Sequence, residues 1–283
     1  MFWYGLPMKP FHFYSPLVDI KNAKLKLRRW NKPDISEFID WNIDEQKEFL
    51  LSLKTHSSEI EEINDFNKVQ SSGIGPGYGE IEAYFLYLII RKFQPSRIIE
   101  VGSGVSTYYS LQALKRNAEE NRNKSEMICI EPFPTDYITN LAKNKTLQLI
   151  KDEVQNIPIN QFESLQKGDV LFIDSSHVAK IDSDVNFLIL EVLPKLSEGV
   201  IIHFHDILLP MPAPPINHPL FDQYLQWNEN AILKSFLMFN KSFKILNSQS
   251  YFYHLSPKLI LDTIPKFNKK IHCPASIWLK KVD

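Results

Sequence analysis

Residues 97–107 read Arg97-Ile-Ile-Glu-Val-Gly-Ser-Gly-Val-Ser-Thr107, and they predict the first strand and the ligand loop of a doubly wound α/β domain. Ile98, Ile99 and Val101 form the β-branched apolar run expected of a central parallel strand that is buried on both faces. The run ends at Gly102-Ser103-Gly104, where two glycines let the backbone turn tightly and approach a ligand. A helix that begins near Ser106 would direct its free N–H groups at the same place.

The loop departs from the dinucleotide fingerprint, which requires a third small residue. Thr107 stands at that position here, with the polar Ser106 before it. Glu100 places a carboxylate just before the glycines, where it would repel a pyrophosphate and attract a cationic ligand. These features favour S-adenosylmethionine over NAD as the cofactor. A lone Gly-x-Gly turn also occurs without any ligand, so its weight depends on the residues that follow.

The composition favours one α/β domain. With 283 residues and 44% hydrophobic content, the chain can bury one substantial core. Its 32 lysines and arginines against 33 acidic residues leave a net charge of -1, which provides no basic field for nucleic acid. Cys129 and Cys273 are typical of the reduced cysteines of a cytoplasmic protein rather than of a disulfide framework.

No segment has the character of a membrane anchor or an export signal. The longest apolar run, residues 83–90, is too short to span a bilayer. We therefore expect a small-molecule substrate, with neither nucleic acid nor membrane as a partner. Whether the protein is a homo-oligomer stays open.

The chain divides into two predicted parts. Residues 1–75 mix aromatic and charged residues and predict an N-terminal cap or helical extension, whereas residues 76–283 predict the S-adenosylmethionine-binding domain. Four glycines between positions 73 and 79 precede an apolar helix over 81–93. Tyr78 could contact the cofactor, because a helix that precedes the first strand packs beside the glycine loop. It could equally belong only to a turn.

The next elements predict the nucleoside side of the site. A helix to about residue 120 leads to a second strand over 127–131, which ends in Glu131. A carboxylate at this position can accept two hydrogen bonds from the vicinal hydroxyls of a ribose, so Glu131 is the predicted ribose ligand. A third strand over 147–150 should place residues 152–155 beside the adenine.

Two further strands predict a reaction edge. The fourth strand, over 169–174, ends in Asp174, and Ser175-Ser176-His177 follows. The fifth strand, over 200–205, ends in His205 and is followed by Asp206. Right-handed crossovers bring the carboxyl ends of such parallel strands to the edge that carries the glycine loop.

The remaining segments complete a seven-stranded, mostly parallel sheet. A loop over 209–219 carries five prolines and is predicted to border the substrate, followed by a helix over 228–240. Phe221, Tyr224 and Trp227 suggest an aromatic wall behind this loop. Strands near 243–247 and 275–281 would form an antiparallel last pair.

Asp174, His205 and Asp206 together could hold one divalent ion. Carboxylates favour Mg or Mn, whereas an imidazole shifts the preference toward transition metals such as Fe. The alternative interpretation of Asp174 and Asp206 is that each only caps a helix. His203 alternates with His205 along the strand and fits a hydrogen-bonded core histidine better than a ligand, although the sequence leaves this open.

From residue 75 to 282 the chain resembles the class I S-adenosylmethionine-dependent methyltransferases, whose first motif reads acidic-x-Gly-x-Gly. Its Asp-Ser-Ser-His and His-x-His-Asp segments resemble the bacterial type 24 family and the metal-dependent small-molecule O-methyltransferases. The resemblance implies a Rossmann-like methyltransferase fold, metal binding at Asp174 and at His205-Asp206, and a catalytic base at His177. His205 departs from these relatives, which carry a carboxylate there.

The resulting expectation is metal-assisted O-methylation of a small hydroxylated molecule by direct displacement at the sulfonium methyl group. Asp174 and His177 are the predicted catalytic residues. Two alternatives stay open. One is a non-haem iron oxygenase type of enzyme that uses Asp174, Asp206 and His205 or His203. The other is a cofactor-binding protein without catalysis.

Overall fold

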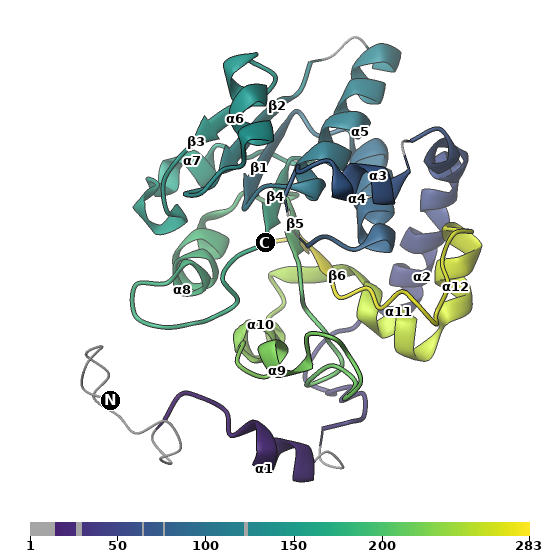
Figure 1. The fold of residues 1–283 in the computed structure, drawn as a ribbon, viewed down its shortest axis with the longest axis vertical. Coiled ribbons are helices and arrows are strands. Elements are labelled where there is room, and N and C mark those ends of the chain that lie inside the picture. The colour runs from purple at the N-terminus through teal and green to yellow at the C-terminus, as the bar shows by residue number, and fades with distance from the viewer. Residues whose placement is uncertain (1–14, 27–29, 64, 76, 122–123) are drawn as a thin grey trace.

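The computed structural model of the protein describes residues 15–26, 30–63, 65–75, 77–121 and 124–283. It is built around one seven-stranded sheet (Figure 1). The strands are β1 (Arg97–Val101), β2 (Glu126–Ile130), β3 (Gln148–Ile150), β4 (Val170–Ile173), β5 (Ile201–Phe204), β6 (Phe243–Ser248) and β7 (Ile277–Lys281). Their order is β3-β2-β1-β4-β5-β7-β6, and β7 runs antiparallel to both β5 and β6. The predicted doubly wound, mostly parallel sheet is confirmed.

Helices cover both faces of this sheet (Figure 1). In chain order they are α1 (Ile20–Leu25), α2 (Ile43–Ser52), η3 (Leu53–Glu61), α3 (Phe66–Ser71), α4 (Glu80–Phe93), α5 (Val105–Asn121), α6 (Asp136–Lys143), η4 (Val154–Asn156), α7 (Ile159–Glu163), α8 (Asp184–Phe187), η5 (Leu188–Val192), η6 (Leu193–Lys195), α9 (Phe221–Tyr224), α10 (Glu229–Leu237), α11 (Gln249–Leu255) and α12 (Pro257–Thr263). Among the described helices, none combines the length and apolar character needed to cross a membrane.

The strands alternate strictly between the two cores, as buried parallel strands do. Ile98 and Phe172 point into the core formed with α4, α5 and η3. Ile99 and Leu171 point into the opposite core, which contains α8, η5 and α10. α4 is buried on almost all sides because it lies against the sheet, α5 and η3 together. The central strands are therefore rigidly held from both faces.

The strand order reverses between β1 and β4, which are neighbours in the sheet. At the end of β1, Gly102 has a φ of +87°, and a Cβ there would lie 2.6 Å from the carbonyl oxygen of Asp174. Only glycine fits both constraints. Ligands bind at such reversal points in open α/β sheets, and here the close contact brings the glycine loop against Asp174.

The N-terminal part packs on the second half of the chain. Asp34 donates a backbone hydrogen bond to Pro210, and Phe239 donates one to Phe38. Leu50 and Phe66, by contrast, lie in the same core as α4. Among the described residues, Asp34 thus contacts the proline loop, whereas Leu50 and Phe66 belong to the core of the main domain. The predicted boundary at residue 75 stays a prediction, and residues 1–14, 27–29 and 64 of that part lie outside the described residues.

Some helices differ from the sequence expectation. The segment between β4 and β5 forms α8, followed by a π-helical turn, η5, and a short 3₁₀ turn, η6, in place of one regular helix. α11 and α12 were not predicted, because residues 249–263 show no clear apolar period. They are held by contact with the N-terminal part: Ser57 Oγ donates to Thr263 O at 2.6 Å. Tertiary packing therefore specifies these two helices.

A buried ion network joins η3, α4 and α5. Arg91 is 1% exposed and donates to both oxygens of Glu59, at 2.7 and 3.1 Å, and to Glu120 at 2.7 Å. Burial acts to raise the pKa of Glu59, but hydrogen bonds from Arg91, Tyr87 and His56 outweigh it and lower this pKa to about 2. The carboxylate is therefore ionised in the folded protein at neutral pH.

Glu59→Gln should lower the free energy of unfolding by about 1–3 kcal/mol at pH 7, because Arg91 loses a charged hydrogen-bond partner. The folded pKa of Glu59, about 2, is below its ordinary value of 4.5. Its stabilisation is therefore complete above pH 4.5 and is lost as the pH falls toward 2. Urea unfolding at stepwise lower pH should show the variant and the wild type converging.

Glu61→Gln is the control, because Glu61 is 68% exposed and lies 3.7 Å from Lys266. Exposed pairs contribute less than about 1 kcal/mol, so this variant should stay near the wild type at every pH. Equal losses of stability in both variants would contradict the role assigned to the buried network.

Candidate active site

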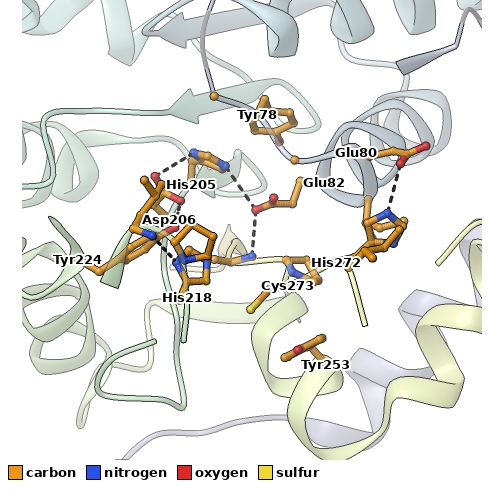
Figure 2. Close-up of a pocket in the computed structure, with 18 of the residues that line it drawn as sticks. Tyr78, Glu80, Glu82, His205, Asp206, His218, Tyr224, Tyr253, His272 and Cys273 are labelled. Atoms are coloured by element: carbon orange, nitrogen blue, oxygen red, sulfur yellow. Dashed lines mark hydrogen bonds and ion pairs between the residues drawn. The ribbon is translucent and has the colours of Figure 1, made fainter. Parts of the chain in front are cut away.

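Two cavities open at the carboxyl edge of the parallel strands. The glycine-loop cavity, of about 540 Å³, is lined by Gly102, Glu131 and Asp174, among other residues. The aromatic cavity, of about 760 Å³, is lined by Tyr78, His205, Asp206, Tyr224 and Trp227, among others. Figure 2 shows His205, Asp206, Tyr224 and His218 gathered at one end of the aromatic cavity, away from His272 and Tyr253.

Glu131 stands at the wall of the glycine-loop cavity, as the sequence predicts. One of its oxygens accepts from Phe133 N at 2.9 Å, and the other lies 3.5 Å from Ser103 Oγ. Val154 and Gln155 line the same cavity, where the adenine was expected. These contacts leave acceptor capacity on Glu131 for two hydroxyl groups. The ribose role itself stays a prediction.

Glu100 supports the loop from inside the protein. Its carboxylate is fully buried and accepts from Ser106 Oγ and Thr107 Oγ1, both at 2.6 Å, and from Cys129 Sγ at 3.2 Å. Burial raises the pKa of Glu100 to about 7, against the opposing effect of these hydrogen bonds. Gly104 N donates to Thr107 Oγ1 at 3.0 Å. The geometry gives Glu100, Ser106 and Thr107 a bracing role, and their direct contact with a cofactor stays a prediction.

Tyr78 lies in the aromatic cavity and does not line the glycine-loop cavity. Its ring lies 4.7 Å from that of His205, and its hydroxyl lies 3.4 Å from His203 Nε2. His203 is fully buried and stacks on Phe172 at 4.2 Å. Burial holds the pKa of His203 well below its usual range. This residue is therefore a neutral core histidine, the reading that the alternation along β5 favoured.

The strand ends bring Asp174, His205 and Asp206 together. His205 Nδ1 lies 3.3 Å from Asp174 Oδ1 and 3.5 Å from Asp206 Oδ2. Burial acts to lower the pKa of His205, but Asp206, Asp174 and Glu82 raise it well above its usual range. For Asp174, burial acts to raise the pKa, and His205 and His177 together lower it below the usual range. The group is thus an ion cluster at neutral pH.

His177 joins the same cluster from the loop after β4. Its Nε2 lies 3.5 Å from both Asp174 Oδ1 and Asp206 Oδ2, and its Nδ1 lies 2.7 Å from Glu229 Oε2. Burial acts to lower the pKa of His177, but Asp174 and Glu229 raise it to about 10. We call Asp174, His177, His205 and Asp206 the acid-histidine cluster.

Two buried glutamates that contact the histidines of the cluster were not predicted from the sequence. Glu229 Oε2 holds His177, and the backbone N–H groups of Asn228 and Glu229 donate to His177 O at 3.1 and 3.2 Å. Glu82 Oε1 lies 3.4 Å from His205 Nε2 and accepts from Ala275 N at 3.0 Å. Glu229 follows His177 by 52 residues, and no sequence spacing links such distant residues.

The aromatic wall is confirmed for two of its three members. Tyr224 and Trp227 line the aromatic cavity, and the Tyr224 hydroxyl donates to Asp206. Trp227 lies 4.3 Å from the His177 ring, measured between centroids. Phe221 is instead buried and stacks on Trp30 at 6.0 Å. Phe221 faces Trp30 because it lies on the side of α9 that points away from the aromatic cavity.

The cluster has the donor chemistry of a metal site. Ligand atoms of Asp174, His177 and Asp206 all lie within 4.8 Å of one another. Carboxylate oxygens and imidazole nitrogens suit divalent ions of the Mn and Fe kind. His205, the imidazole ligand predicted from sequence, borders both aspartates. These residues therefore fit a divalent ion, and its binding stays a prediction.

Comparison with known proteins finds a similarity to one family over the central strands. Residues 99–207 match the type 24 family described as "Methyltransferase domain". An uncharacterized protein of Archaeoglobus fulgidus is 29% identical over 174 residues, which are 58% of this chain and 76% of that protein.

Solved structures give weaker similarities. SAH-bound methyltransferase PaMTH1 of Podospora anserina is 15% identical, with 96% of this chain and 100% of that chain covered and a TM-score of 0.43. An O-methyltransferase of Bacillus cereus in complex with SAH is 12% identical, with 80% and 91% covered and a TM-score of 0.41. Scores this low say nothing about individual residues. The match over residues 99–207, together with the seven-stranded sheet, makes the chain similar to the class I S-adenosylmethionine-dependent methyltransferases of the type 24 kind.

Proposed function

We propose that the protein transfers the methyl group of S-adenosylmethionine to an oxygen atom of a small hydroxylated molecule, with assistance from a divalent metal ion. The acid-histidine cluster carries this proposal, because it stands between the two cavities. Asp174 lines the glycine-loop cavity, whereas Asp206 and His205 line the aromatic cavity. A cofactor in the first cavity and an acceptor in the second would meet at these side chains.

The glycine-loop cavity suits the nucleoside part of the cofactor. Glu131 offers acceptor atoms for the ribose hydroxyls, and Val154 supplies an apolar contact beside them. Asp174 closes the cavity on the side of the cluster, where an anionic side chain attracts a sulfonium. The cofactor already carries its leaving group, so the protein must chiefly align the acceptor oxygen with the methyl carbon.

The aromatic cavity suits a small acceptor with both apolar and polar groups. Tyr78, Tyr224 and Trp227 offer ring faces, and Asp206 and His218 offer hydrogen-bonding atoms. Pockets of this size and mixture hold small molecules in many proteins. A bound divalent ion, held by Asp174, Asp206 and an imidazole, would lower the pKa of an acceptor hydroxyl.

The acceptor hydroxyl loses its proton during transfer. The sequence predicts that His177 is the base that accepts this proton, and this role stays a prediction. His177 Nε2 faces both aspartates, so an ion bound there would compete for the same lone pair. The oxygenase alternative uses the same acidic residues but leaves the glycine-loop cavity without a purpose. The methyl transfer proposal assigns a ligand to each of the two cavities.

Glu131→Ala should weaken the binding of S-adenosylhomocysteine by about 1–3 kcal/mol, which is roughly 5- to 150-fold in Kd, because the ribose loses a charged acceptor. Titration calorimetry measures this directly. Glu163→Ala is the matched control, since Glu163 is an exposed glutamate at the end of α7. Unchanged affinity in Glu131→Ala would remove Glu131 from the cofactor site.

Asp206→Asn should reduce methyl transfer by at least about 10²-fold while S-adenosylhomocysteine binds as in the wild type. Asp206 lines the aromatic cavity and not the glycine-loop cavity, and it has a φ of 54°, which asparagine tolerates. The assay is transfer of a labelled methyl group to a panel of diols and catechols.

Asp262→Asn is the control for this variant, because Asp262 is exposed on α12. Removal of metal with EDTA should lower the wild-type rate as Asp206→Asn does, and added Mn²⁺ should restore it. Full activity after EDTA treatment, with no metal found by elemental analysis, would argue against metal assistance and leave methyl transfer itself intact.

A further inference from the structure

We propose that Asp174, His177, His205 and Asp206 form one four-donor metal site, and that the buried Glu229 and Glu82 hold its two imidazoles in place. This makes His177 a ligand instead of the base, and it selects a transition-metal ion over Mg²⁺. The inference rests on the metal assistance in the proposed function and extends it to residues that the sequence motif does not identify.

Donor atoms of the four residues form a ring, in which those of Asp174, His177 and Asp206 all lie within 4.8 Å of one another. His177 Nε2 lies 3.5 Å from Asp174 Oδ1 and 3.5 Å from Asp206 Oδ2. His205 Nδ1 lies 3.3 Å and 3.5 Å from the same two oxygens. Each aspartate oxygen therefore stands between two imidazole nitrogens. Donor atoms of one metal site lie at spacings close to these, since the ion binds each of them at about 2.0–2.2 Å.

Each imidazole is fixed from behind by a buried carboxylate. Glu229, with a side chain 2% exposed, meets His177 Nδ1 at 2.7 Å, and it also accepts from Ser175 Oγ at 3.1 Å. Glu82, 8% exposed, meets His205 Nε2 at 3.4 Å. Histidines that bind metals commonly donate their second N–H to a carboxylate in this way, which points the other nitrogen at the ion.

The charge of this group of side chains also favours a bound divalent cation. Four carboxylates face only two imidazoles, so the group keeps a net charge of about -2 even when both rings are protonated. In the part of the chain that the structure describes, no lysine or arginine forms an ion pair with Glu82, Asp174, Asp206 or Glu229. An uncompensated negative charge is costly in so enclosed a place. A divalent cation supplies the missing charge.

The donor types determine which ion is preferred. Mg²⁺ favours oxygen ligands and keeps several waters, whereas imidazole nitrogen suits Mn²⁺, Fe²⁺, Co²⁺ and Zn²⁺. A site with two imidazoles should thus bind Mn²⁺ or Co²⁺ more tightly than Mg²⁺. The lone pair of His177 Nε2 is then bound to the ion, so His177 is not available as the base.

The test is a titration of the metal-free full-length protein with Mn²⁺, followed by electron paramagnetic resonance, with no cofactor or acceptor present. The wild type should bind one ion, and Glu229→Gln should bind it about 10- to 100-fold more weakly, the usual effect of losing the partner of a ligating histidine. Asp262→Asn is the control for non-specific carboxylate binding. Mg²⁺ should compete poorly.

His177 is tested as a direct ligand by spin-echo measurements, which detect nitrogen bound to Mn²⁺. The nitrogen signal should weaken in His177→Ala at saturating Mn²⁺ and persist in Glu229→Gln. S-adenosylhomocysteine binding and thermal melting confirm that each variant is folded. Should Glu229→Gln melt early, His177→Ala alone decides.

Wild-type affinity for Mn²⁺ in His177→Ala, or Mg²⁺ binding as tight as that of Mn²⁺, would overturn the four-donor site. A wild type that transfers methyl groups but binds no Mn²⁺ would also overturn it, while the methyl transfer proposal would stand. A wild type that fails to bind S-adenosylhomocysteine would instead refute the proposed function.

Discussion

The close approach of Gly102 to the carbonyl of Asp174 is the constraint on which the site depends. A Cβ at Gly102 would lie 2.6 Å from that oxygen, so the ends of β1 and β4 can meet only where the first strand ends in glycine. This contact closes the point where strand order reverses. It also makes Asp174 a wall shared by the cofactor loop and the acid-histidine cluster.

Buried charges determine how the side chains next to this contact are arranged. Glu82, Asp174, Asp206 and Glu229 come from α4, the end of β4, the end of β5 and α10, and they converge on two histidines. Burying so many carboxylates is unfavourable unless cations balance them. For Asp206, burial is the largest effect and raises the pKa against the lowering effect of His205 and His177. This shift follows from moving a carboxylate out of water, and the negative charge of Asp174 adds to it.

Backbone geometry holds the cluster at some conformational cost. His177 has a φ of 62° and Asp206 a φ of 54°, both in the left-handed region that few residues other than glycine adopt. Such conformations persist where the surroundings determine them fully, and they concentrate at functional sites. Here the first turn of α10 supplies two N–H groups to His177 O, while Tyr224 binds Asp206 from α9. Elements α9 and α10 thus hold Asp206 and His177 at the carboxyl edge of the sheet.

The sequence by itself determined the sheet and the main residues at its edge. Apolar runs of strand length, glycines at the strand ends and acids after the strands report local requirements of the backbone, so Glu131, Asp174 and Asp206 were found from order alone. Their arrival at one edge follows from right-handed crossovers, which need no knowledge of side-chain packing.

Only the tertiary structure decided how the side chains are used. Glu100 sits at the acidic position of the first motif, and its oxygens accept hydrogen bonds from Ser106 and Thr107 inside the protein. Glu82 and Glu229 became partners of the histidines because α4 and α10 pack against strand ends far away in sequence. The reason is physical: a strand pattern records which face is buried, whereas the partner of a buried charge depends on which distant element covers that face.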